Sequence, residues 1–158
     1  MRSFPYVLCI IDMQWTFTAS HNPLLIRKVV SLIKKAIFDK AYICVAQYKY
    51  MGRTQERLIE LIRKYPYKSY CSTYNNDKGM AIYRRMSRDK VQMRGSHFKV
   101  CGVNTDACVQ ATIRGLRTMF PGIDIYIERS ACNTCSAKEM ADAAISGLLS
   151  YPTVFVTP

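Results

Sequence analysis

A carboxylate, a cysteine and a lysine in this sequence are residue types that can perform acid–base and nucleophilic chemistry together. Asp12 directly follows the apolar run 6–11, and Cys108 follows a second apolar run, 98–103, at the start of a helical pattern. Backbone N–H groups and the helix dipole favour a thiolate in the first turn of a helix and would lower the cysteine pKa below ~8.5. An ionised Asp12 nearby would oppose this shift, so the net direction depends on how the pair shares its proton. Lys68 can stabilise nearby anions. Together these residues would provide a base, a nucleophile and a cation.

Each of these residues also has an ordinary structural interpretation. An aspartate after a strand often braces the next loop, and a single lysine is usually a surface residue. Most cysteines pack as small apolar side chains, which fits Cys9, Cys44 and Cys101 inside their predicted strands. The lone Cys132–Cys135 pair lacks the second pair that a zinc site needs, so we interpret it as structural.

Hydrophobic periodicity predicts how the chain positions these residues. Short β-branched runs predict strands, three- and four-residue spacing predicts amphipathic helices, and a Ser136–Glu139 capping box predicts the start of the last helix. The predicted strands are 6–11, 42–46, 67–71, 98–103, 123–127 and 153–157, and the predicted helices are 23–40, 54–65, 80–86, 106–119 and 136–149.

Strands that alternate with helices predict an α/β fold: a three-layer, Rossmann-like domain over residues 1–158 with a six-stranded parallel sheet. The expected strand order is 3-2-1-4-5-6, and a flavodoxin-like order is the alternative. Ligands of such sheets bind beyond the carboxyl ends of the strands, where the order reverses. That point lies between the first and fourth strands, which Asp12 and Cys108 follow.

Composition limits the remaining possibilities. The 158 residues carry 23 Lys and Arg against 11 Asp and Glu, a net charge of +12, which either solvates the surface or attracts an acidic partner. The sequence has no apolar run long enough to span a membrane, and its start lacks a signal-peptide cleavage pattern. Seven cysteines, mostly inside apolar runs, favour reduced thiols in the cytoplasm.

Three segments, in order, resemble the isochorismatase-like cysteine hydrolases, a family that includes nicotinamidases, carbamoylsarcosine-type amidases and isochorismatases. The first is 7–14 with Phe17, the second is Lys68 with Ser72 and Tyr74, and the third is 102–109 with Thr112. The resemblance covers roughly the whole chain in element order. It implies a small-molecule substrate and a homo-oligomer, commonly a dimer or tetramer.

The resemblance also implies roles for individual residues. Asp12 would be the general base and acid, Lys68 would orient groups and stabilise charge, and Cys108 would form a thioester. A cis peptide before Asn104 would let the N–H groups of Asn104 and Cys108 form an oxyanion hole. Residues expected at the substrate pocket are Gln14, Trp15, Phe17, Gln47 and Tyr74.

The stretch 46–50 departs from the nicotinamidase pattern, because it has neither the aspartate nor the histidine of that branch's metal segment. We therefore expect no metal and no cofactor. Ala46-Gln47 instead resembles the isochorismatase branch.

The sequence thus predicts a hydrolase that cleaves the C–N bond of a small amide or carbamoyl compound. One alternative keeps the fold but cleaves a vinyl ether with Asp12 alone. A second is an inactive basic binding module, although the dispersed basic residues and the lack of a nucleic-acid motif argue against a nucleic-acid partner.

Overall fold

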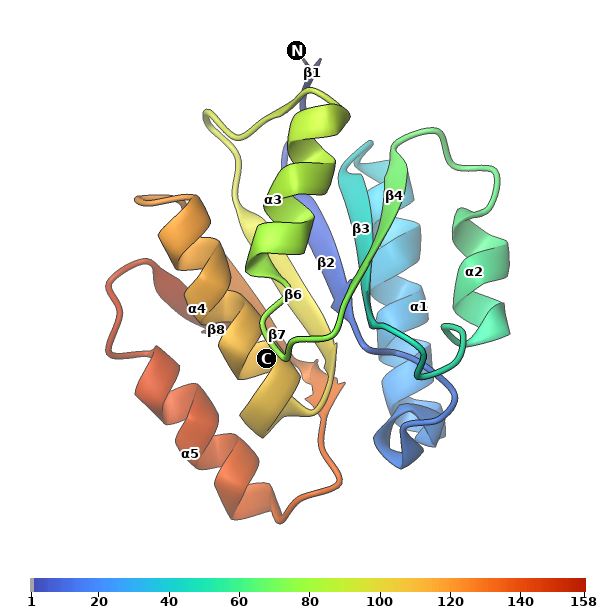
Figure 1. Cartoon of the computed structure of the whole chain (residues 1–158), viewed down its shortest axis with the longest axis vertical. Helices are drawn as coiled ribbons and strands as arrows, with labels where there is room; N and C mark the ends of the chain where they lie inside the picture. Colours follow the sequence, from blue (N-terminus) through green and yellow to red (C-terminus); the bar gives the residue numbers. More distant parts are fainter. Residues whose placement is uncertain (1) are drawn as a thin grey trace.

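The computed structural model describes residues 2–158, in which a parallel sheet of six strands is covered by helices on both faces (Figure 1). The sheet strands are β2 (Val7–Ile11), β3 (Tyr42–Tyr48), β4 (Lys68–Thr73), β6 (Phe98–Val103), β7 (Ile125–Asn133) and β8 (Val154–Thr157). The helices are α1 (Pro23–Phe38), α2 (Glu56–Ile62), α3 (Gly79–Arg88), α4 (Gln110–Met119) and α5 (Lys138–Leu148). Two single-turn helices, η1 (Thr18–His21) and the π-helical η2 (Thr105–Val109), precede α1 and α4.

The strand order is β4-β3-β2-β6-β7-β8, and all five pairings are parallel. This is the 3-2-1-4-5-6 order expected from the sequence, so the predicted α/β fold is confirmed. The order reverses between β2 and β6, which pair from Val7↔Phe98 to Ile11↔Gly102. The two central strands therefore end together, and the segments that follow them meet at one edge of the sheet.

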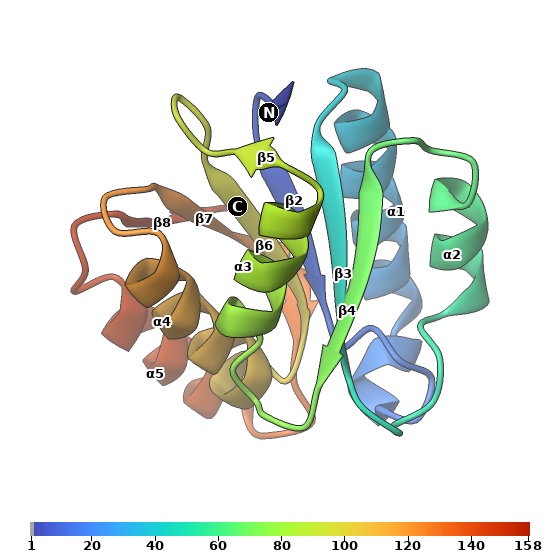
Figure 2. The same ribbon diagram turned by 45° about the horizontal axis from the view of Figure 1, so that its top comes forward.

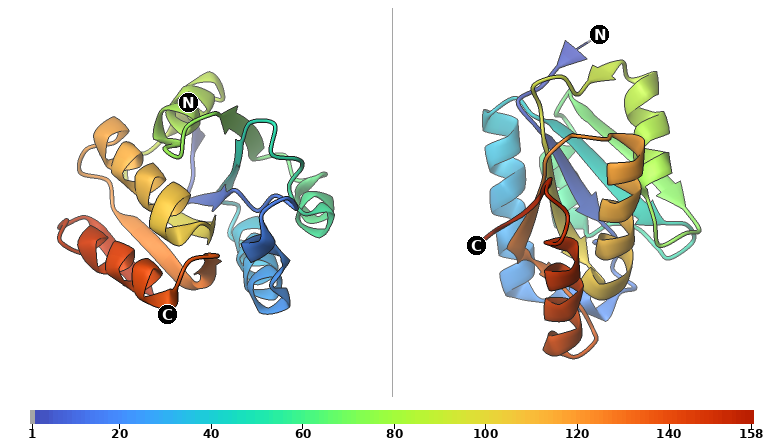
Figure 3. Two further views of the ribbon diagram at one scale, coloured as in Figure 1. Left: turned by 60° about the horizontal axis from the view of Figure 1, so that its bottom comes forward. Right: turned by 90° about the vertical axis from the view of Figure 1, so that its left-hand side faces the viewer.

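Two apolar clusters hold the helices against the sheet. Helices α1 and α2 cover one face through residues such as Val29 and Ile62, whereas α3, α4 and α5 cover the other through residues such as Ile82 and Ile113. Figure 3 shows the two helix layers on either side of the sheet. Strand β2 is buried at all five residues, as expected for a central parallel strand.

Three details differ from the sequence expectations. Helix α5 begins after Ala137, which makes no side-chain cap, and the N–H of Ser136 donates to Thr134 Oγ1 (3.2 Å), so the predicted capping box is wrong. A two-stranded sheet of β1 (Arg2–Ser3) and β5 (Val91–Gln92) was not predicted, because each strand is too short to show periodicity (Figure 2). No helix in residues 2–158 is long and apolar enough to cross a membrane.

Candidate active site

Asp12 lies at the carboxyl end of β2, where the strand order reverses. Its backbone is left-handed (φ 50°), and its N–H still donates to Ala46 O (2.9 Å), so the sheet holds the residue in place. The side chain is fully buried, and neither carboxylate oxygen has a directed hydrogen bond. A buried carboxylate is costly unless a cation pairs with it.

The cation that pairs with Asp12 is Lys78. Its Nζ lies 3.1 Å from Asp12 Oδ2, and both side chains have zero exposure. The ammonium also donates to Asn75 O (2.7 Å) and Asn76 O (3.3 Å), and it lies 4.7 Å from the centre of the Tyr48 ring. These acceptors satisfy its remaining protons, as a buried ammonium requires.

Close helix packing places Lys78 there. Lys78 immediately precedes α3, and its N–H donates to Thr112 Oγ1 on α4 (3.1 Å). A Cβ at the next residue, Gly79, would lie 2.4 Å from the Gly115 carbonyl carbon of α4. Only glycine permits this approach, which brings the start of α3 against the helix that follows Cys108.

Cys108 lies in η2 and is 4% exposed. Its Sγ–H points to Asn76 Oδ1, 3.6 Å away. Burial and the neighbouring Asp12 carboxylate raise the pKa of the thiol from 9.0 to about 12, against the opposing effects of Lys78 and Asn104. Of the two opposed effects expected from the sequence, desolvation and the carboxylate therefore outweigh the helix terminus, and the balance favours the thiol form.

A second glycine brings the Cys108 segment close to Asp12. Gly102 has φ 135°, and a Cβ there would lie 2.0 Å from Ile11 O. After it, Asn104 adopts a left-handed conformation (φ 59°, ψ 58°), and its carbonyl accepts from the N–H of Ala107 (3.0 Å) and of Val109 (3.1 Å). The structure has no cis peptide bond within residues 2–158, so the expected cis bond before Asn104 is not present. The left-handed residue makes the turn instead.

The structure does not bring Lys68 to this site. Lys68 is the first residue of β4 and pairs with Ile43, near the amino end of the sheet, whereas Asp12 contacts Ala46 at the carboxyl end. Its Nζ donates to Tyr65 O (2.7 Å). The expected convergence of Lys68 with Asp12 and Cys108 is therefore wrong, because a lysine that begins a parallel strand lies at the edge away from the site.

A signal for Lys78 was present in the sequence. The residues that matter in such a sheet follow the strands, and Lys78 lies in the loop after β4, just before a glycine that opens a helix.

The expected pocket residues have other contacts. The Gln14 amide is fully used: Nε2 donates to Tyr48 O (2.9 Å) and Gly52 O (2.8 Å), and Oε1 accepts from the Tyr48 N–H (2.8 Å). Gln47 Nε2 donates to Thr54 Oγ1 (2.6 Å), so the residue that favoured vinyl-ether cleavage is engaged within the protein.

The three expected aromatic residues lie outside the buried cluster of Asp12, Lys78 and Cys108. Phe17 packs partly buried against the α1 side of the core, and Trp15 is exposed. Tyr74 is also exposed; its ring centre lies 5.5 Å from that of Tyr50 and 4.7 Å from Lys49 Nζ. Their place in a substrate pocket remains a prediction.

Nothing in the described residues groups three or more His, Cys, Asp or Glu side chains in a geometry that could hold a metal ion. All seven cysteines are free. Cys132 is half-buried in β7, and Cys135 is exposed.

Comparison of the fold with solved structures finds extensive similarity. MAR1 ribonuclease from Caenorhabditis elegans matches with a TM-score of 0.79 and 18% identity over 99% of this chain and 80% of that one. The nicotinamidase of Staphylococcus aureus matches with a TM-score of 0.76 and 16% identity over 98% of this chain and 99% of that one. YcaC from Escherichia coli, an octameric hydrolase of unknown specificity, matches with a TM-score of 0.76 and 12% identity over 97% of this chain and 75% of that one.

No protein-family model matches the sequence, and a search of curated proteins finds no match. The structure comparison shows that the chain shares its fold with nicotinamidases, a branch of the family that its sequence motifs resemble. At these identities the similarity shows the fold alone.

Proposed function

We propose that the protein is a cysteine hydrolase that cleaves the C–N bond of a small amide or carbamoyl compound, with Asp12, Lys78 and Cys108 as its reactive groups. The observation that carries this proposal is the buried Asp12–Lys78 ion pair beside a cysteine at a helix start, at the point where the strand order reverses. The shared fold with nicotinamidases supports the same chemistry.

The raised pKa of Cys108 determines the order of steps. Because the resting group is a thiol, the nucleophile forms only as its proton leaves, and Asp12 is the base that receives it. Sγ then bonds to the substrate carbonyl carbon. We expect the N–H groups of Asn104 and Cys108 to bind the developing oxyanion, with the left-handed turn at Asn104 in place of the cis bond. Asp12 returns the proton to the leaving nitrogen as the C–N bond breaks, which leaves a thioester.

Hydrolysis of the thioester reuses the same carboxylate. Asp12 takes a proton from water, the hydroxyl oxygen bonds to the acyl carbon, and the C–S bond breaks as Cys108 recovers a proton. The products are a carboxylic or carbamic acid and an amine or ammonia. The Lys78 ammonium, 3.1 Å from Asp12 Oδ2, offsets the negative charge that passes between Asp12, Sγ and the oxyanion.

Asn76 supports an amide as the substrate. Its side-chain carboxamide already lies against Cys108, with Oδ1 3.6 Å from Sγ. A substrate amide would take the place of this carboxamide at Cys108.

Self-association and location complete the proposal. The octameric YcaC shares the fold, which supports a homo-oligomer, and analytical ultracentrifugation tests this. The seven free cysteines support a reducing, cytoplasmic location.

Turnover of an amide panel by two lysine variants tests the proposed site. We expect Lys78→Gln to lose at least ~100-fold in kcat/KM and Lys68→Gln to retain wild-type turnover, since only Lys78 contacts Asp12. Because Lys78 is buried, thermal unfolding must accompany the assay, and Cys108→Ala provides a variant with little effect on packing. Equal losses in both lysine variants, or turnover by a folded Cys108→Ala, would contradict the assignment.

A further inference from the structure

A pair of thiols lies between two neighbouring strands at the outer edge of the sheet. Cys44 belongs to β3 and Cys71 to β4, the outermost strand on that side. Their Sγ atoms are 4.0 Å apart, close enough for a hydrogen bond between the two thiols. Both cysteines are free, and neither takes part in the proposed hydrolysis. The pair therefore has a chemistry that the reactive site does not use.

The strand register places both thiols on the face of the sheet that α3 covers. Cys44 pairs with Ser69, and Cys71 lies two residues further along β4, so the two cysteines point to the same side. Cys44 is part of the apolar cluster that contains Ile82 of α3, and Cys71 packs against that cluster. The two thiols and α3 thus meet in one place.

Cys71 gives the pair access to solvent. Its side chain is half-buried and lines a hollow of about 530 Å³ formed by β4, α3 and the loop between them. Cys44 has no exposed surface and lies next to it. A small ion that enters the hollow therefore meets Cys71 first and Cys44 directly after it.

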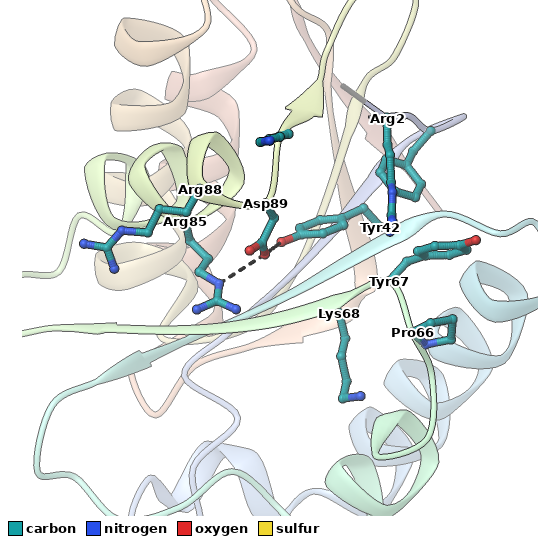
Figure 4. A pocket seen from close by; sticks show the side chains of 10 residues that line it. Arg2, Tyr42, Pro66, Tyr67, Lys68, Arg85, Arg88 and Asp89 are labelled. Atoms are coloured by element: carbon teal, nitrogen blue, oxygen red, sulfur yellow. Dashed lines mark hydrogen bonds and ion pairs between the residues drawn. The ribbon is translucent and has the colours of Figure 1, made fainter.

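The hollow is positively charged. Its lining includes Arg84, Arg85 and Arg88 of α3 and a single carboxylate, Asp77. Arg85 extends from α3 toward β4, and its Nε lies 3.1 Å from Asp89 Oδ2 (Figure 4). Arg84 and Arg88 form no ion pair within residues 2–158. A negatively charged group at Cys71 is therefore favoured here.

The thiol pair releases one proton more readily than two. The hydrogen bond between the sulfurs lowers the pKa of Cys44 and, together with burial, raises the pKa of Cys71. The positive charge of Arg85 favours the thiolate form of both cysteines. A cation placed between the sulfurs would remove the repulsion between two thiolates, which opposes loss of the second proton.

The spacing of the sulfurs fits a bridging metal ion better than a disulfide. A disulfide holds its sulfurs ~2.05 Å apart. Two thiolate–metal bonds of about 2.3 Å place the sulfurs ~4.0 to ~4.6 Å apart for bond angles from about 120° to about 180°, and the observed distance is 4.0 Å. Thiolates select soft ions such as Cu(I) and zinc. Zinc needs four ligands, and residues 2–158 contain no group of three or more suitable side chains, so Cu(I) is the ion that fits.

We propose that Cys44 and Cys71 form a binding site for Cu(I). On binding, two S–H bonds break, two Cu–S bonds form and both protons pass to water, without electron transfer. The complex of two thiolates and one Cu(I) carries one negative charge, which Arg85 offsets from α3. The ion takes no part in amide cleavage, so the proposal does not depend on the hydrolase chemistry.

Competition with the chelator bicinchoninate, whose Cu(I) complex is coloured, tests the proposal on the full chain under argon with ascorbate. We expect Cys71→Ser to weaken the tightest Cu(I) binding by more than ~100-fold, since removal of a ligand costs more than removal of a supporting residue. Because two thiols lose their protons, the affinity of the wild type should rise about 100-fold per pH unit near neutral pH, against about tenfold in Cys71→Ser. Arg85→Gln should weaken binding about tenfold.

The matched control is Cys135→Ser, which removes an exposed cysteine and should leave the affinity unchanged. Cys44→Ala should lose as much affinity as Cys71→Ser; thermal unfolding shows whether each variant is folded, and the half-buried Cys71 decides if the buried variant is not. Wild-type affinity in folded Cys71→Ser, an equal loss in Cys135→Ser, or only a tenfold rise per pH unit in the wild type would overturn the proposal. A larger loss in Cys108→Ala than in Cys71→Ser would assign the ion to the reactive cysteine and would also overturn it.

Discussion

The Asp12→Asn variant should separate the reactivity of Cys108 from turnover. The thiol pKa rises by three units, from 9.0 to about 12, which corresponds to about 4 kcal/mol. Cys108 is only 4% exposed, so solvent screens this effect little. Burial is the largest cause and persists in the variant, whereas the carboxylate and its negative charge are removed.

Loss of the carboxylate lowers the pKa of Cys108, so the thiolate population at pH 8 rises in the variant, tenfold for each unit by which the pKa falls. Alkylation of Cys108 by iodoacetamide, followed by mass spectrometry of its peptide, should accelerate accordingly. Amide turnover should fall by ~100-fold or more, since the proton acceptor is gone.

Asp142→Asn is the matched control, because this exposed carboxylate pairs with Arg129 and should change neither rate. Exposed Cys135 provides an internal standard in each reaction and should be alkylated before Cys108 in the wild type. Slower alkylation of Cys108 in Asp12→Asn, or retained turnover, would refute this reasoning.

Three further predictions concern stability and metal dependence. Gly102→Ala should lower the free energy of unfolding by about 3 kcal/mol or more, since its Cβ would lie 2.0 Å from Ile11 O. Gly147→Ala, in an open part of α5, should be neutral or stabilising by up to ~1 kcal/mol. Urea unfolding compares the two variants, and equal losses of stability would count against the close approach at Gly102. Amidase activity should survive EDTA, because 46–50 offers no imidazole or carboxylate, and activity restored only by added zinc or manganese would show otherwise. Burial and the hydrogen bond to Asp39 raise the pKa of the Tyr6 hydroxyl above its ordinary value of 10.0. The contribution of Tyr6 to folding stability is therefore complete below pH ~10 and is lost as the pH rises further. Tyr6→Phe should flatten the loss of unfolding free energy at alkaline pH, and an unchanged slope would argue against this assignment.

The sequence predicted the fold well because the strand signals are local and redundant. Val7–Ile11 and Phe98–Val103 are continuous apolar runs, and their burial in the centre of a parallel sheet requires that pattern. The same logic placed Asp12 and Cys108 correctly, since each follows a central strand. Connection handedness then left few strand orders to choose from.

The third member of the site escaped prediction because its position depends on packing between helices. Lys78 reaches Asp12 only through the contact of Gly79 with Gly115, two residues far apart in the sequence. The direction of the Cys108 pKa shift could not be decided from the sequence for a similar reason: the helix start favours a thiolate, but burial and the nearby Asp12 carboxylate outweigh it. Both effects arise only when separate segments meet.

Trapping of an acyl group on Cys108 tests the central claim most directly. The protein would be incubated with a panel of small amides, quenched in acid and digested, and the peptide that contains Cys108 would be weighed by mass spectrometry. The proposed mechanism predicts an acyl adduct on Cys108 alone that disappears with hydroxylamine and that Lys68→Gln still forms. Turnover of an amide with an unmodified Cys108, or with the acyl group on another cysteine, would contradict it.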